Sequence, residues 1–207
     1  MQELYKELLE KYGQQGWWPL LGSAPEGRYT SYHPGNYSLP DSDDDRLQVS
    51  VGAILTQNTN WLNVEKALHN LSEAGALSAR GLREMKLEHL AELIRPSGYY
   101  NQKARKLKIF IQFFAGLEGR MPDREELLSL WGIGRETADS ILLYAYQKSI
   151  MVIDNYTRRV FKAAGIKGYD LAYDKLRQYC EQQMPDEYRI MQEFHALLVK
   201  AGKELNK

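Results

Sequence analysis

Apolar residues recur at helical spacing along most of the chain. At its start, Leu4, Leu8 and Tyr12 share one helical stripe, and Gly13 follows as a stop signal. Only residues 149–153 have a β-branched, strand-like composition, and so short a stretch favours a bridge between two helices over a sheet. The pattern therefore predicts an all-α protein. Its later helical stretches span residues 47–57, 61–75, 87–98, 101–117, 124–132, 136–147, 155–165, 171–183 and 187–205.

Residues 14–45 break the helical pattern. This stretch is rich in Gly and Pro and carries the tandem Trp17 and Trp18. It ends in the acidic run 41–45, which suits the N-terminus of a helix through the helix dipole. A connector of this length is typical of either a functional loop or a disordered segment, and the sequence leaves both interpretations open.

The composition is that of a globular protein. Its 207 residues are 43% hydrophobic, enough for a core, and no apolar run is long enough to span a membrane. The first residues are amphipathic and charged, unlike a secretory signal, so we expect a cytoplasmic protein. Cys180 is the only cysteine, which excludes an internal disulfide and sites built from several thiolates. Lys and Arg (27) balance Asp and Glu (27), so binding to a polyanion would rest on local features.

Two glycines one residue apart, Gly132 and Gly134, separate two of the predicted helices. Glycine reaches positive φ at no steric cost and lets another backbone approach, so the pair predicts a tight helical hairpin. The second helix would begin near Arg135 with its free N–H groups outward, where a phosphate could bind without regard to base sequence. An ordinary turn between helices carries the same G-x-G pattern and is the alternative interpretation.

The surroundings of this turn resemble a known family. Residues 127–145, followed by residues 152–165, resemble the helix-hairpin-helix and Gly/Pro-to-Asp signature of the endonuclease III superfamily of DNA glycosylases. Residues 51–68 and 94–107 also look like that superfamily, and all these stretches occur in its order. The resemblance covers roughly residues 46–165.

The resemblance implies a two-lobed helical fold that binds DNA. We expect a central bundle over residues 46–160 and a second lobe formed by residues 1–45 together with residues 161–207. Double-stranded DNA with a damaged base would lie in the cleft between the lobes. The protein would act as a monomer, without membrane contact, in association with the nucleoid.

The resemblance places the catalytic carboxylate of such enzymes at Asp154. An ionised carboxylate near C1′ would stabilise an oxocarbenium-like sugar or activate water. A helix N-terminus would lower the pKa of this carboxyl and keep it charged. The alternative is that Asp154 only caps the helix over residues 155–164, and the two roles can coexist.

Glu136 stands where bifunctional members of the superfamily carry a lysine. The amine of that lysine attacks the sugar and forms a Schiff base, which leads to strand cleavage. A carboxylate cannot form an imine. The resemblance therefore implies a monofunctional glycosylase that releases a base and leaves an abasic site.

Two loops resemble those that fill the gap left by an extruded base. Gln57 and Asn58 fall in the first of these loops, and Tyr99 falls in the second. We expect these residues to contact DNA. The alternatives are that Gln57 and Asn58 cap helices or bond to the backbone, and that Tyr99 is an ordinary loop aromatic residue.

Three tryptophans resemble the base pocket of the 3-methyladenine glycosylase branch. In that branch, aromatic rings from the places of Trp17, Trp18 and Trp61 sandwich the flipped purine. An N-alkylated purine is cationic, so stacking between indoles would gain cation–π attraction that an unmodified base lacks. The alternative is that these tryptophans are core anchors.

Lys203 matches a basic residue that closes the pocket in that branch, with a solvated terminal lysine as the alternative. Leu197 stands where the branch can carry a second lysine, so we expect no carbamylated lysine here.

No cofactor is expected. Many superfamily members bind a [4Fe–4S] cluster through four cysteines after the last helix, but the given chain ends at Lys207, and Asn206 stands near the first cysteine position. We therefore predict no cluster and no metal site, although the hairpin of such an enzyme could hold a monovalent cation.

The leading functional prediction is excision of alkylated purines, 3-methyladenine first, by base flipping and hydrolysis. Two alternatives stay open. One is a glycosylase for another lesion, such as an oxidised base or mispaired adenine. The other is a helix-hairpin-helix module that binds DNA without catalysis.

Overall fold

The computed structural model describes residues 1–22 and 24–205; Asn206 and Lys207, named above for the cysteine position, lie outside this part. The described chain is mainly helical, and its two short strands form a single antiparallel pair, which confirms the all-α prediction. In chain order the elements are α1 (Gln2–Tyr12), β1 (Leu20–Leu21), β2 (Thr30–Ser31), α2 (Asp43–Leu55), α3 (Trp61–Glu73), α4 (Ala79–Glu84), α5 (Leu87–Leu93), the 3-10 helix η1 (Arg95–Ser97), α6 (Tyr100–Gly116), α7 (Arg124–Ser129), α8 (Arg135–Ser140), the π-helix η2 (Ile141–Ala145), α9 (Asn155–Ala163), α10 (Tyr173–Gln183) and α11 (Tyr188–Glu204).

Local sequence signals set where several of these helices begin. The side chain of Ser42 accepts a hydrogen bond from the Asp45 N–H, and Asp43 to Asp45 occupy the first turn of α2, as the acidic run predicts. Asn60 caps α3 in the same way, by accepting from the Asn63 N–H. These caps matter for the site because α2 ends, and α3 begins, at the loop that carries Gln57 and Asn58.

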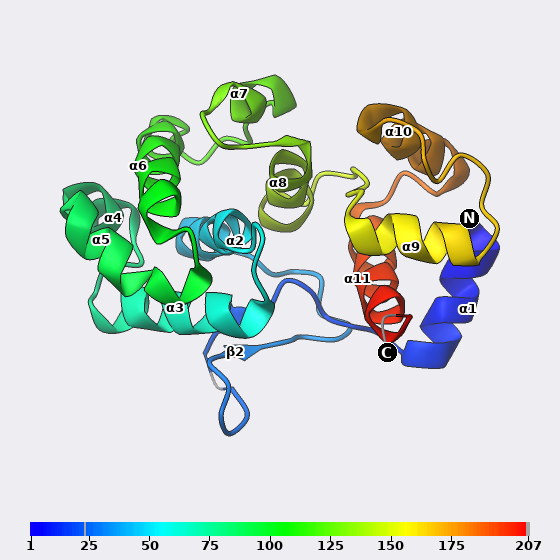
Figure 1. Cartoon of the computed structure of the whole chain (residues 1–207), viewed down its shortest axis with the longest axis horizontal. Helices are drawn as coiled ribbons and strands as arrows, with labels where there is room; N and C mark the ends of the chain where they lie inside the picture. Colours follow the sequence, from blue (N-terminus) through cyan, green and yellow to red (C-terminus); the bar gives the residue numbers. More distant parts are fainter. Residues whose placement is uncertain (23, 206–207) are drawn as a thin grey trace.

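The helices stand in two groups: α2 to α8 with η1 and η2 form the first group, and α1, α9, α10 and α11 form the second (Figure 1). α2 is the central element of the first group. All its residues from Leu47 to Leu55 are buried, and it contacts α3, α6, α8 and η2. α9 and α1 both pack on α11, and these helices stand on the opposite side of the molecule from α3 to α6 (Figure 1). The predicted division of the chain at residues 46 and 160 stays a prediction, and residue 160 lies within α9.

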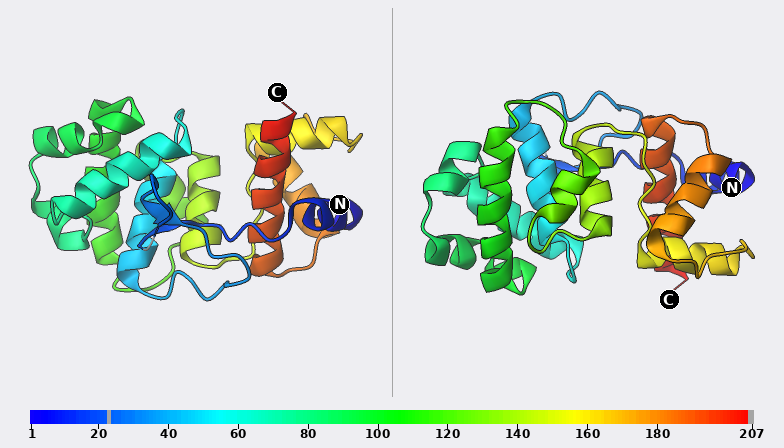
Figure 2. Two further views of the ribbon diagram at one scale, coloured as in Figure 1. Left: turned by 90° about the horizontal axis from the view of Figure 1, so that it is seen from below. Right: turned by 90° about the horizontal axis from the view of Figure 1, so that it is seen from above.

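Of the connector, the structure describes residues 14–22 and 24–42, which cross from one group of helices to the other before α2 begins (Figure 2). Leu20 pairs with Ser31 and Leu21 pairs with Thr30, which closes a small hairpin. The buried Glu193 on α11 accepts hydrogen bonds from the Gln15 N–H at 2.6 Å and the Tyr37 hydroxyl at 2.9 Å. These contacts fix the connector on α11 at Gln15 and Tyr37.

Residues 149–153 form an extended bridge from η2 to α9 and belong to no strand. Ile150 to Ile153 are buried, and the Met151 N–H donates to Glu181 on α10 at 3.0 Å. The prediction that this segment links two helices is confirmed, and the link places Asp154 at the start of α9.

Among the described residues, no helix is both long and apolar enough to cross a membrane.

A buried ion pair ties the connector hairpin to α3. The Glu65 side chain is 1% exposed and accepts two hydrogen bonds from the Arg28 guanidinium, each 2.8 Å long. The Thr30 hydroxyl also donates to Glu65. Removing one partner would leave a buried carboxylate without its counter-charge.

We therefore expect Arg28→Met to lower the free energy of unfolding by about 2 kcal/mol, less than for a fully buried pair because Arg28 is one-third exposed. Denaturant unfolding measures this change. Arg80→Met is the matched control, because Arg80 pairs with Glu84 on the surface, where such pairs contribute about 0.3–0.5 kcal/mol. Equal effects of the two substitutions would contradict this role of the Arg28–Glu65 pair.

Candidate functional site

A cavity of about 450 Å³ opens between the two groups of helices, within the range typical of ligand pockets. Its walls come from the connector, the loop between α2 and α3, the N-termini of α8 and α9, and one face of α11. Eight of the predicted site residues line it: Trp17, Trp18, Gln57, Asn58, Trp61, Glu136, Asp154 and Lys203. The fold thus brings together residues that lie up to 186 positions apart in the sequence, since the lining runs from Trp17 to Lys203.

Asp154 occupies the N-cap of α9. Its Oδ1 accepts a hydrogen bond from the Thr157 N–H at 2.7 Å, so the capping role is real. Burial raises the pKa of Asp154, but the nearby His195 and the Thr157 hydrogen bonds outweigh this effect and place the pKa below its usual value. Only 13% of the side chain is exposed, and it lines the cavity. An ionised carboxylate is therefore held at the cavity wall.

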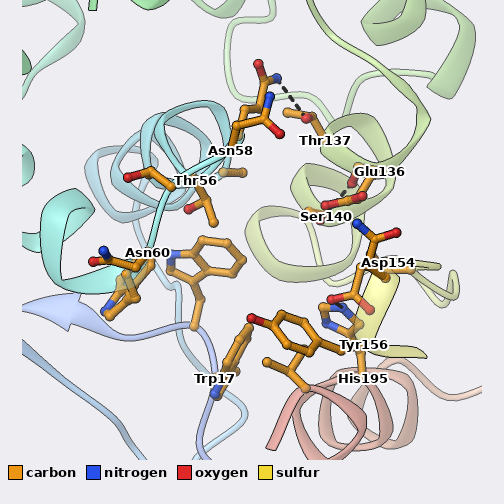
Figure 3. A pocket seen from close by; sticks show the side chains of 18 of the residues that line it. Trp17, Thr56, Asn58, Asn60, Glu136, Thr137, Ser140, Asp154, Tyr156 and His195 are labelled. Atoms are coloured by element: carbon orange, nitrogen blue, oxygen red, sulfur yellow. Dashed lines mark hydrogen bonds and ion pairs between the residues drawn. The ribbon is translucent and has the colours of Figure 1, made fainter. Parts of the chain in front are cut away.

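His195 is a site residue that the sequence reasoning missed. It lies on α11, is 4% exposed, and points toward Asp154, with Nε2 3.6 Å from Oδ2 (Figure 3). Its Nδ1 lies 2.7 Å from the buried Tyr144 hydroxyl. His195, Val199 and Lys203 all line the cavity at i, i+4 and i+8 on α11. That spacing from Lys203 is the signal by which the sequence could have indicated His195.

Glu136 lies in the first turn of α8 and faces the cavity near Asp154 (Figure 3). The residue as a whole is exposed, and it is among the residues that line the cavity. Reduced hydration and then the negative charge of Asp154 raise the pKa of Glu136, and His195 opposes the rise. The cavity thus holds two carboxyl groups whose pKa values move apart, with Asp154 the more readily ionised.

The three tryptophans differ in their surroundings. Trp18 is 6% exposed, lies edge-on to Trp61 at a centroid distance of 5.3 Å, and packs against Tyr144 at 5.2 Å. Trp18 is therefore a core anchor that also forms part of the cavity wall, as the alternative interpretation has it. Trp17 and Trp61 are only partly buried and line the cavity. Both are more exposed than Trp18.

Trp61 is held by the connector hairpin. Its indole N–H donates to the Thr30 hydroxyl at 3.3 Å, and Thr30 in turn donates to Glu65. The Arg28–Glu65 pair therefore supports one wall of the cavity as well as the hairpin.

Gln57 is engaged within the protein. Its Nε2 donates to the Gly132 carbonyl at 3.2 Å and to the Thr137 hydroxyl at 2.9 Å, and its Oε1 accepts from Lys106. Gln57 thus joins the α2–α3 loop to the hairpin, which is the backbone-bonding alternative. Asn58, with φ 54°, sits in the left-handed region at the cavity mouth (Figure 3).

Tyr99 lies outside the cavity lining and is 67% exposed, with φ 47°. The buried Lys103 joins the ends of the two helices that precede the Asn58 and Tyr99 loops, since it donates to the Leu55 carbonyl of α2 at 2.8 Å and to the Ser97 carbonyl of η1 at 2.6 Å. Burial and then the charge of Lys106 lower the pKa of Lys103 to about 8. The side chain of one buried lysine therefore links the starting points of both loops with predicted DNA contacts.

The hairpin forms as predicted, but its glycines serve different needs. Gly132 has φ 85°, and a Cβ there would lie 2.5 Å from Cε of Lys106, so this position requires glycine. Gly134 has φ −91° and is the N-cap of α8, with open space where a Cβ would be, so the expectation of positive φ is wrong there. Arg135 is exposed but pairs with Asp174 at 2.8 Å, which the sequence pattern did not indicate.

Lys203 is exposed at the cavity edge. Reduced hydration lowers the pKa of Lys203, while the charge of Asp154 acts in the opposite direction. Leu197, where the branch can have a second lysine, is fully buried in the core. Within residues 1–22 and 24–205, no three His, Cys, Asp or Glu side chains are grouped as metal ligands.

Sequence comparisons place the chain among DNA repair proteins. The family model described as HhH-GPD superfamily base excision DNA repair protein matches residues 51–186. The chain is 37% identical to a provisionally named DNA repair glycosylase, MJ1434, of Methanocaldococcus jannaschii, over 98% of this chain and 86% of that protein. It is 34% identical to endonuclease III of Thermotoga maritima over 59% of this chain and 58% of that protein.

Solved structures show the same fold. The crystal structure of Helicobacter pylori 3-methyladenine DNA glycosylase (MagIII) bound to 1,N6-ethenoadenine superposes with a TM-score of 0.74 and 27% identity, over 98% of this chain and 97% of that chain. A non-covalent endonuclease III–DNA complex has a TM-score of 0.72 and 20% identity, over 96% and 82% of the two chains, which supports the fold alone. With a family model across most of its length and a relative this similar from end to end, the chain belongs to the HhH-GPD superfamily of base excision DNA repair proteins.

Proposed function

We propose that the protein is a monofunctional DNA glycosylase that removes alkylated purines, 3-methyladenine first, from double-stranded DNA. The observation that carries this proposal is the juxtaposition in one cavity of an ionised Asp154 with the partly buried rings of Trp17 and Trp61. A DNA base reaches such a cavity only when it is flipped out of the duplex. The likeness to the H. pylori enzyme along nearly both full chains supports the substrate class.

The chemistry follows from the charges that face the cavity. An N-alkylated purine is a delocalised cation, so indole faces attract it more strongly than a neutral base. When the C1′–N bond breaks, its electron pair passes to the purine, which leaves as a neutral base, and positive charge develops on the sugar. The Asp154 carboxylate stabilises that charge and takes a proton from the water that forms the C1′–O bond. Because the leaving group is already cationic, no general acid is required.

Glu136 supports hydrolysis without strand cleavage. It occupies the first turn of α8, at the cavity, where a carboxyl group cannot form an imine with the sugar. The proposed enzyme therefore stops at the abasic site. It acts as a monomer without a resident cofactor, and DNA approaches along the hairpin, the Asn58 loop and the Tyr99 loop. Gly132, Gly134 and Arg135 lie on this approach, although Arg135 must exchange its Asp174 partner to reach a phosphate.

Asp154→Asn should slow base release strongly while DNA binding persists, because the amide keeps the size of the side chain and loses its charge. We expect the rate of 3-methyladenine release from methylated DNA, measured with EDTA present, to fall by roughly 10²–10³-fold. Asp186→Asn, on the exposed turn before α11, serves as the control and keeps the wild-type rate. Release by Asp154→Asn at the wild-type rate would remove Asp154 from the mechanism, and a panel of oxidised and mispaired substrates tests the other lesion classes.

Borohydride trapping tests the absence of lyase chemistry. The wild-type protein should give no covalent adduct with abasic DNA, because the carboxyl of Glu136 faces the site where lyases present an amine. Glu136→Lys should give an adduct, which serves as the positive control for the assay. A wild-type adduct that disappears in Lys203→Met would show instead that Lys203 is an amine nucleophile.

Binding of free 3-methyladenine tests the aromatic walls. Because base–aromatic stacking contributes about 1–3 kcal/mol per base, Trp17→Ala and Trp61→Ala should each weaken binding at least about fivefold. Quenching of intrinsic fluorescence or calorimetry measures this affinity. Trp131→Ala is the matched control, since Trp131 is 55% exposed and lies outside the cavity. Equal affinity in all three variants would place the base elsewhere.

A further inference from the structure

The side chains of His195 and Tyr144 form a buried pair behind Asp154 that the proposed chemistry leaves unused. Tyr144 is 1% exposed, and its hydroxyl lies 2.7 Å from Nδ1 of His195 and 3.2 Å from the Gln192 carbonyl oxygen. The other ring nitrogen, Nε2, is buried without a hydrogen-bond partner among the described residues and lies 3.6 Å from Oδ2 of Asp154. Buried polar atoms are usually hydrogen-bonded, so the position of Nε2 beside a carboxylate needs a physical explanation.

The hydrogen bonds of Tyr144 indicate which atom of His195 carries a proton. If the hydroxyl donates to the Gln192 carbonyl, Nδ1 must donate to the hydroxyl oxygen. Nε2 then either bears a lone pair, which the Asp154 carboxylate repels, or bears a proton, which makes the ring an imidazolium. If the hydroxyl donates to Nδ1 instead, Nε2 carries the proton of the neutral ring. Every attractive arrangement thus directs an N–H at Oδ2 of Asp154.

The groups around Asp154 indicate why its carboxylate needs a hydrogen-bond donor. The other titratable or charged groups near His195 and Asp154 are Glu136 on α8, Tyr156 and Arg159 on α9, and Glu193 and Lys203 on α11. Burial and the second carboxyl of Glu136 both favour a protonated, neutral Asp154. Lys203 lies at the exposed edge of the cavity. His195 is the group that contacts Oδ2 from the protein interior.

We propose that His195, held by Tyr144, is a positioning residue that orients the Asp154 carboxylate and stabilises its negative charge. This inference rests on the proposed role of Asp154 in base release. The Trp17 and His195 rings also form a T-shaped pair, with a centroid distance of 5.9 Å and an interplanar angle of 88°, which restricts the imidazole further. The carboxylate is thus fixed at Oδ1 by the Thr157 backbone and at Oδ2 by the imidazole.

The experiment is a pH profile of single-turnover base release by the wild type, His195→Gln and Tyr144→Phe, with spontaneous depurination subtracted. Loss of the imidazole raises the pKa of Asp154, so the carboxylate becomes protonated at higher pH. The acid limb is the part of the profile in which the rate falls as the pH is lowered. For His195→Gln we expect this limb to lie about 1 pH unit higher than for the wild type, so that at a given pH on the limb the variant is about tenfold slower. Tyr144→Phe leaves the ring free to turn and should move the limb in the same direction by less. His89→Gln, a surface histidine on α5, is the matched control and should leave the profile unchanged.

The outcomes separate a positioning role from a structural one. If His195→Gln lowers the rate equally at every pH, with the limb at its wild-type midpoint, the proposal is wrong. If His195→Gln does not fold, Tyr144→Phe provides the same comparison with the core ring retained.

A titration of the Asp154 carboxyl by carbon-13 NMR, with its signal assigned by loss in Asp154→Asn, reads the pKa without any activity. Should the wild type release no base, the proposed function fails, while an upward pKa shift in His195→Gln would still support the positioning role. An unchanged pKa in that variant would overturn it.

Discussion

One carboxylate at the start of α9 governs both the local fold and the proposed chemistry. Oδ1 of Asp154 accepts the Thr157 N–H and begins the helix, which leaves Oδ2 toward His195 at the wall of the cavity. A buried carboxyl group would ordinarily take up a proton. Here the helix N-terminus and the imidazole outweigh that tendency, so the pKa of Asp154 lies below its usual value. A fixed negative charge with little surrounding water stabilises a developing cation more strongly than a mobile, hydrated one.

The connector shows how a long segment with little regular structure can form part of such a site. It is held by buried carboxylates on two helices. Glu193 on α11 accepts hydrogen bonds from Gln15 and Tyr37 near the two ends of the connector, and Glu65 on α3 accepts them from its middle part. Each carboxylate accepts several hydrogen bonds, so burial of the charge is compensated. As a result, Trp17 and Trp18 are carried into the gap between the two groups of helices, where Trp18 enters the core and Trp17 borders the cavity.

Much of the fold and part of the site could be predicted from the sequence, because both rest on local patterns. Apolar spacing indicates the helices, Ser42 and the acidic run mark the start of α2, and the motif around Gly132 leads to Glu136 and Asp154. What could not be predicted depends on contacts between distant segments. Tyr144 lies within an apolar helical run that indicates only core, its contact with His195 joins η2 to α11, and the pairing of Arg135 with Asp174 joins α8 to α10. The side chain of Gln57 satisfies the hairpin backbone across 75 positions, which no local pattern reveals.

The central claim is that Asp154 stabilises positive charge on the sugar of a flipped nucleotide. The most direct measurement compares the affinity of the protein for two duplexes, one with a cationic pyrrolidine abasic site and one with a neutral tetrahydrofuran abasic site. If the claim is right, the wild type prefers the cationic duplex by about a hundredfold or more, as expected for a mimic of the transition state, and Asp154→Asn loses the preference. Equal affinity of the wild type for both duplexes, or a preference that survives in Asp154→Asn, would contradict the account.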